Sequence, residues 1–248
     1  MSDDDQVPVD ASNLLTGTRS RSAKHNYEDA TVLVIVEDKE FAVHKSLLKR
    51  YSMYFETLFA GPWRETNPVR GTNDSKLVSA TCPIEVQLRG LKKDEFDIFL
   101  DLIYDFDVDS KLSWLEISQI VSLLSACEYL LAEKFSEVGQ QALRKLGINW
   151  DNICDYLGAL KNAHSENIPS LKAVQVRCVA FLKRAGPANR VHVLYIAEQY
   201  GISELLSDDY QHQWPRKLRT DEHFEMLSFE LRYRLLYNQV FENPCCFS

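Results

Sequence analysis

The sequence has no apolar run long enough to cross a bilayer. The longest, ATVLVIV at 30–36, has seven residues, whereas a transmembrane helix needs about 20. The first residues are acidic rather than basic and no apolar segment follows them, so we expect no secretory signal. Positive charge is scarce too: 28 Lys and Arg stand against 36 Asp and Glu, a net charge of −8. A general nucleic-acid-binding protein needs a dense basic face, so we expect no nucleic-acid partner.

The six cysteines have no CxxC spacing. Cys127 and Cys178 fall on apolar helical stripes and are expected to be small buried hydrophobes. This usage is typical of a reducing compartment, so we expect a cytoplasmic and/or nuclear protein. Aspartate, glutamate and histidine show no metal-ligand spacing, so neither a metal nor a cofactor is expected.

Sequence motifs of catalysis are missing as well. No P-loop, GxGxxG turn, GxSxG elbow or HExxH helix occurs. The stretch from Ser46 to Lys49 fits SxxK, but the companion motifs of that class are absent and its two leucines have an obvious packing use. We therefore expect no catalytic residues and no enzyme activity.

The amino-terminal half combines strand and helix patterns. Residues 1–28 are polar without apolar periodicity and predict a flexible tail. TVLVIV, a polar turn and EFAVH predict a β-hairpin over 31–44. Helical periodicity follows, with Ser52 as an N-cap. After a loop over 61–83, IEVQL predicts a third strand.

The rest of the chain is predicted to be helical. A clear apolar stripe begins after Asp94, and Ser113 with Glu116 has the capping-box spacing of a helix start. Gly147 marks a helix stop, and no strand pattern returns after it. We therefore predict a helical region over 148–243 and a short tail at 244–248, with Pro169 at the first turn of one helix.

The order of these elements resembles the BTB/POZ domain family. FAVHKSLLKRYSMYF, VQL, FDIFLDLIY and LLSACEYLLAEKF stand in the family's order and cover about 29–147. The resemblance implies an α+β fold with a three-stranded sheet and about five helices. The helical remainder is similar to the BACK-type extensions of such proteins. The family motif falls on Phe41, His44, Leu48, Ser52 and Phe55.

His44 is the only histidine in this motif. It lies where a strand turns into a helix, where its ring can satisfy open backbone groups. A lone histidine among apolar residues is more often a hydrogen-bonded part of the fold than a ligand, so we interpret His44 as structural.

The resemblance also implies a homodimer. In several family dimers an aspartate and the basic residue after the histidine line a charged pocket at the interface. Lys45 is that basic residue. The position of the acid corresponds to Thr31, and Asp29 lies two residues earlier. Either the hairpin is longer here and Asp29 serves, or Thr31 replaces the acid.

BTB proteins that recruit cullin-3 carry a hydrophobic-x-Glu triplet just after the S-x-x-F helix. Trp63, Arg64 and Glu65 stand there. The alternative is that Trp63 folds back onto its own domain as a loop anchor. The resemblance thus implies a protein-interaction module, with a substrate adaptor of a cullin-3 ubiquitin ligase as the leading hypothesis. The alternatives are a scaffold or transcription-linked BTB protein acting without a cullin, an elongin C-like subunit and an unrecognised enzyme.

The last four residues, CCFS, fit the C-a-a-X pattern of prenylation with Cys245 as the acceptor. No polybasic run precedes them, and one lipid chain alone anchors weakly. Both a farnesylated and an unmodified Cys245 are compatible with the sequence.

Overall fold

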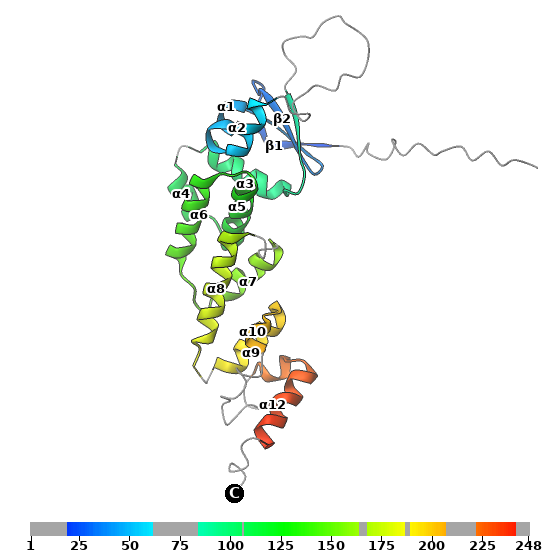
Figure 1. Ribbon diagram of the computed structural model, residues 1–248, viewed down its shortest axis with the longest axis vertical. Coiled ribbons are helices and arrows are strands. Elements are labelled where there is room, and N and C mark those ends of the chain that lie inside the picture. The colour runs from blue at the N-terminus through cyan, green and yellow to red at the C-terminus, as the bar shows by residue number, and fades with distance from the viewer. Residues whose placement is uncertain are drawn as a thin grey trace, which may run out of the picture. The chain divides into compact units, whose positions relative to one another are not determined.

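The structure, a computed structural model, describes residues 19–61, 84–105, 107–163, 168–186, 189–206 and 222–241 (Figure 1). The chain divides into two compact units. The first spans Met1–Asp105 with Tyr129–Ala132, and the second spans Phe106–Glu128 with Glu133–Ser248. Each unit is built around its own set of elements.

The first unit contains a four-stranded sheet of order β1-β3-β2-β4. Its strands are β1 (Ser20–Asn26), β2 (Val32–Val36), β3 (Lys39–Val43) and β4 (Ile84–Leu88). The β2–β3 hairpin is antiparallel, and β4 runs parallel to β2 from Val32↔Ile84 to Val36↔Leu88. Glu37 closes the hairpin turn with φ 54. The central strand β2 has four of its five side chains fully buried, which explains its continuous apolar sequence.

Strand β1 corrects the predicted flexible tail. Residues 20–26 pair in parallel with β3, with Ser20 beside Lys39 and an irregularity between Arg21 and Asn26. The predicted tail of 1–28 was therefore too long, and the sheet has four strands instead of three. The sequence pattern of this strand was weak because its two buried side chains belong to the polar residues Ser22 and His25. Such a strand shows no apolar alternation.

Helices α1 (Lys45–Tyr51), α2 (Met53–Ala60) and α3 (Lys93–Ile103) complete the first unit. Ser52 caps α2 as predicted: its Oγ accepts a hydrogen bond from the Phe55 N–H at 3.2 Å. The same hydroxyl donates to the Leu130 carbonyl at 2.6 Å. Phe41, Phe55 and Phe96 are fully buried, and the rings of Phe41 and Phe96 meet edge to face at 5.1 Å.

The described part of the second unit is helical. Gly147 follows α6 with φ 66, and Pro169 opens α8, as the sequence predicts. A capping box at Ser113 was wrong, since Ser113 is the last residue of α4 and the next helix begins at Ile117. The helices are α4 (Val108–Ser113), α5 (Ile117–Tyr129), α6 (Glu133–Leu146), α7 (Ile153–Asn162), α8 (Pro169–Lys183), α9 (Arg190–Tyr200), α10 (Ser203–Leu206), the 3-10 turn η6 (Phe224–Met226) and α12 (Phe229–Phe241).

Two apolar clusters stabilise the helices of the second unit. The larger joins α5 and α6 to α7, α8, α9 and α10, and includes Tyr156, Leu171 and Cys178. The smaller joins α9 to η6 and α12 through Leu194, Phe224 and other apolar side chains. Cys127 and Cys178 are buried free thiols, as predicted. In the described part of the chain no helix has both the length and the apolar character of a membrane span.

Candidate interaction surface

His44 links the first helix to α3 and to the loop before β2. Its backbone N–H donates to the Tyr104 Oη at 2.9 Å, and its Nδ1 lies 2.8 Å from the same oxygen. Because the phenol oxygen accepts from the backbone, its own hydrogen is free to go to Nδ1. The other ring nitrogen, Nε2, lies 3.1 Å from the Asp29 carboxylate.

Aromatic rings surround this histidine. Tyr27 stacks on Tyr104 with ring centroids 4.6 Å apart, and lies 5.2 Å from the His44 ring. Burial, offset in part by the hydrogen bond from the His44 backbone, raises the pKa of Tyr104 to about 12. The ring and backbone of His44 therefore connect the start of α1 to the end of α3.

The three residues predicted for a dimer interface lie at the same end of α1. The Lys45 backbone N–H donates to Thr31 Oγ1 at 2.8 Å. Asp29, with its side chain 84% exposed, pairs with His44 and not with Lys45. Thr31 precedes the first residue of β2. The structure thus brings Thr31 to Lys45 and Asp29 to His44.

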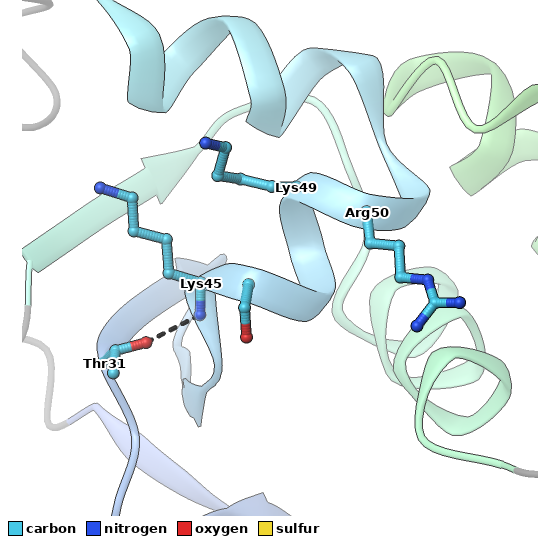
Figure 2. Close-up of a pocket in the computed structure, with 5 residues that line it drawn as sticks. Thr31, Lys45, Lys49 and Arg50 are labelled. Carbon is cyan, nitrogen blue, oxygen red and sulfur yellow. Dashed lines mark hydrogen bonds between the residues drawn. The ribbon is translucent and has the colours of Figure 1, made fainter.

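Next to this end of α1 is an open pocket of about 580 Å³. Among the described residues it is lined by Thr31, Lys45, Ser46, Lys49 and Arg50 (Figure 2). Figure 2 shows the side chains of Lys45 and Lys49 extending toward the same side of the helix, with Arg50 pointing away from them. We call this surface the α1 basic pocket.

Two cations of the α1 basic pocket have aromatic neighbours. The Lys45 ammonium lies 4.9 Å from the centroid of the Phe59 ring, and the Arg50 guanidinium lies 5.4 Å from that of Tyr51. No described carboxylate pairs with Lys45, Lys49 or Arg50. Elsewhere in the first unit cations have acidic partners, for example Lys39 with Asp97 and Lys93 with Asp38. The pocket is therefore a positively charged spot on an acidic protein.

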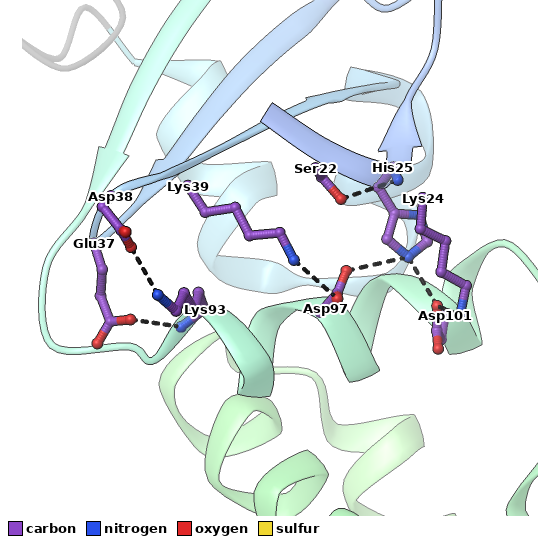
Figure 3. Close-up of polar contacts among 9 residues, drawn as sticks. All are labelled: Ser22, Lys24, His25, Glu37, Asp38, Lys39, Lys93, Asp97 and Asp101. Atoms are coloured by element: carbon purple, nitrogen blue, oxygen red, sulfur yellow. Dashed lines mark hydrogen bonds and ion pairs between the residues drawn. The ribbon is translucent and has the colours of Figure 1, made fainter. Parts of the chain in front are cut away.

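A second polar site, which sequence reasoning missed, joins β1 to α3 (Figure 3). His25 is 2% exposed, and its Nε2 lies 2.8 Å from Asp101 Oδ1 and 3.6 Å from Asp97 Oδ1. Lys24 also pairs with Asp101. Burial alone would raise the pKa of Asp101, but hydrogen bonds from His25 and Lys24 outweigh it and lower that pKa. Asp97 and Asp101 are four residues apart, so both carboxylates lie on one face of α3. This spacing was the only sequence signal that pointed to the site.

The remaining predicted sites lie outside the described residues. These are the triplet of Trp63, Arg64 and Glu65 and the prenylation candidate Cys245. The other motif positions, Phe41, Leu48, Ser52 and Phe55, are all buried in the first unit. Within the described ranges no group of three histidine, cysteine, aspartate or glutamate side chains could hold a metal ion.

Comparison with known proteins identifies the family. Residues 20–146, half of the chain, match the BTB/POZ domain. The chain therefore belongs to the BTB/POZ domain family. Domains of this family are protein–protein interaction modules that also mediate dimerisation and are generally non-catalytic. The helical region that follows is consistent with a BACK-like extension.

Solved structures and curated proteins add little to this assignment. Among the solved structures 31 chains match, including the BTB domain of zebrafish PATZ1. That chain is 20% identical, with 47% of this chain and 76% of that chain covered and a TM-score of 0.33. No curated protein matches. The family match begins nine residues before the predicted domain start at 29 and ends at 146, beside the predicted boundary at 147.

Proposed function

We propose that this protein is a substrate adaptor of a cullin-3 ubiquitin ligase, without catalytic activity of its own. The observation that carries the proposal is the BTB/POZ match over residues 20–146. Its support at the level of residues is the position in sequence of Trp63 and Glu65, directly after the helix that Ser52 caps. An exposed indole would supply a large rigid anchor for a partner. The helices after 146 would then hold the substrate.

Calorimetric titration with the amino-terminal region of cullin-3 tests this role. We expect saturable binding by the full chain and its loss in a Trp63→Ala, Glu65→Lys double variant. The matched control is Trp114→Ala, Glu116→Lys, because Trp114, Leu115 and Glu116 form the same kind of triplet elsewhere. A control that loses binding would move the contact to that second triplet. A folded wild type that does not bind would remove the adaptor role.

The adaptor is further proposed to be a homodimer with Lys45 at its interface. Thr31 and Asp29 both lie at the start of α1, where Thr31 contacts Lys45 and Asp29 pairs with His44. Lys45 has no acidic partner among the described residues. At low micromolar concentration, sedimentation equilibrium should give at least twice the chain mass of 28.6 kDa. Lys45→Glu should lower the mass measured at the same concentration, whereas Lys172→Glu, at an exposed lysine of α8, should leave it unchanged. A wild type that is monomeric at micromolar concentration would contradict the dimer.

A BTB scaffold or transcription-linked protein that acts without a cullin is the second candidate. The α1 basic pocket favours it, because three cations without described acidic partners offer a contact for an acidic protein segment. The cullin titration separates the two candidates directly: absence of binding together with a stable dimer would favour the scaffold.

Two further expectations belong to this proposal. A cytoplasmic and/or nuclear location fits an intracellular adaptor, and fluorescence microscopy of the tagged chain would check it.

Farnesylation of Cys245 stays a prediction from the last four residues. Mass spectrometry of the native protein with an unmodified Cys245 would remove it.

A further inference from the structure

A groove lies between α4 and α6 in the second unit. It has a volume of about 230 Å³ and is lined, among the described residues, by the side chains of two short segments. The apolar ones are Leu112, Val138, Ala142 and Leu146, and the polar ones are Ser113, Gln141 and Lys145. Leu146 is 48% exposed although it belongs to this apolar set. The groove thus offers an apolar surface with a polar rim.

The volume of the groove limits the size of the group that it can bind. Pockets that take drug-sized ligands measure roughly 300–1,000 Å³, so about 230 Å³ suits one large side chain. An indole matches both parts of this lining. Its ring can contact the apolar residues, while the Gln141 carbonyl at the rim can accept from its single N–H.

An indole is available directly beside the groove. Trp114 follows Ser113, which lines the groove, and is 84% exposed. It is the most exposed large apolar side chain among the described residues. Trp150, by contrast, packs against Phe181 and His192. Exposure of most of an indole to water is unfavourable in free energy. Burial of an aromatic side chain removes on the order of 150–250 Å² of surface from solvent.

The charges beside the indole and the groove are opposite. Glu116 lies two residues after Trp114 and is exposed, and Lys145 lies on the groove rim. Neither side chain forms an ion pair with a described residue. A copy that inserts Trp114 into the groove of another copy would therefore bring the acidic Glu116 toward Lys145.

We infer that the α4–α6 groove binds Trp114 of a second copy of this chain, reciprocally across a two-fold axis. A two-fold contact uses the same patch on both partners, so a projecting side chain and its groove must lie on one surface. Ser113 lines the groove at the end of α4, and the exposed Trp114 follows it as the C-cap of that helix, so the indole and the groove belong to neighbouring parts of the surface. Trp114 is the anchor, and the pair of Glu116 and Lys145 sets the orientation.

This contact is distinct from the proposed homodimer at Lys45 and does not depend on it. A chain with two different two-fold contacts builds assemblies larger than a dimer. The mass of the wild type should therefore continue to rise with concentration beyond two chains. In a Lys45→Glu background the α4–α6 contact alone should still give a concentration-dependent dimer.

Sedimentation velocity of the full chain over a micromolar concentration series tests the contact. Trp114→Ala should raise the dissociation constant of this step at least about tenfold, as expected for a buried tryptophan anchor. Phe229→Ala is the matched control, since Phe229 is 78% exposed on α12, and it should leave the step unchanged. Circular dichroism should show both variants folded.

A charge exchange provides the second measurement. Glu116→Lys and Lys145→Glu should each weaken the step several-fold, because each places like charges together. The double variant should return the dissociation constant to within about twofold of the wild type. A wild type whose mass does not change with concentration, or a step that Trp114→Ala leaves intact, would overturn the inference. Binding of an acidic tryptophan-containing peptide by a chain that does not self-associate would assign the groove to another protein and likewise overturn it.

Discussion

A single phenol oxygen joins two helices of the first unit. Tyr104 Oη accepts from the His44 backbone and lies within hydrogen-bond distance of the His44 ring. Loss of this oxygen would leave a backbone N–H and an imidazole nitrogen without partners in a partly buried place. Groups left unsatisfied in this way cost more than the net value of the bonds they made.

We expect Tyr104→Phe to lower the free energy of unfolding by about 1–3 kcal/mol. Urea denaturation followed by circular dichroism would measure this change. Tyr27→Phe is the matched control, because Tyr27 belongs to the same ring stack, and its cost should stay within about 0.5 kcal/mol. Equal costs for the two variants would show that the hydroxyl of Tyr104 is unimportant.

The same hydroxyl predicts a stability change in alkali. The pKa of Tyr104 is raised from 10.0 to about 12, chiefly by burial. A raised folded-state pKa means that the contribution is complete below the unfolded value and is lost as pH rises through the folded value. The free energy of unfolding of the wild type should therefore fall between about pH 10 and 12. That of the Tyr104→Phe variant should fall less steeply over the same range. Parallel curves would contradict the assignment.

Among the elements, strand β1 has an attachment of its own. Besides its pairing with β3, it is held to α3 by His25 and Lys24, which both contact Asp101. Asp101→Asn should weaken this link while the β2–β3 hairpin and β4 keep their pairing. Amide hydrogen exchange should therefore speed up about tenfold in residues 20–26 and remain unchanged in β2. Asp94→Asn, an exposed acid of the same helix, serves as control; faster exchange throughout the sheet would contradict a local link.

Acid should loosen β1 in the wild type. The pKa of Asp101 is lowered from 3.8 because hydrogen bonds and charge from His25 and Lys24 outweigh its burial. A depressed folded-state pKa contributes stability above the unfolded value, and this contribution is lost as pH falls through the folded value. The protection factors of the β1 amides, which correct for the intrinsic pH dependence of exchange, should thus fall below about pH 4, and Asp101→Asn should lack most of that fall.

At the scale of the whole molecule, the chain has a core in each unit, and among the described residues the core of the second unit is built from helices. Leu171 on α8 is fully buried in the larger cluster of the second unit. Leu171→Ala should cost about 2–5 kcal/mol through lost apolar contact and the remaining cavity. Val176→Ala on the same helix, where Val176 is 60% exposed, should cost within about 0.5 kcal/mol. Chemical denaturation would measure both, and similar costs would contradict the burial of Leu171.

The α1 surface depends on the whole first unit as well. His44 and Lys45 follow each other in sequence, but their partners Tyr104, Asp29 and Thr31 come from other elements. A surface assembled in this way exists only in the folded unit. Partner binding through it should therefore be lost together with the fold.

The sequence by itself determined the hairpin, the helix starts at Ser52 and Pro169, the stop at Gly147 and the resemblance to BTB/POZ domains. These features are local: an alternating or continuous apolar pattern, a capping side chain or a glycine acts on its own segment of chain. The family motif is equally local, since its buried residues Phe41, Leu48 and Phe55 lie on the three consecutive elements β3, α1 and α2.

Only the tertiary structure decided the place of β1, the partners of His44 and the groove beside Trp114. Strand β1 buries the polar residues Ser22 and His25, and the partner of the His25 ring, Asp101, lies 76 residues away in the sequence. The capping box at Ser113 failed because α4 ends there, which spacing alone does not reveal. Long-range partners carry no local pattern, so a polar residue in sequence can be a surface residue or a buried link, and only the fold distinguishes the two.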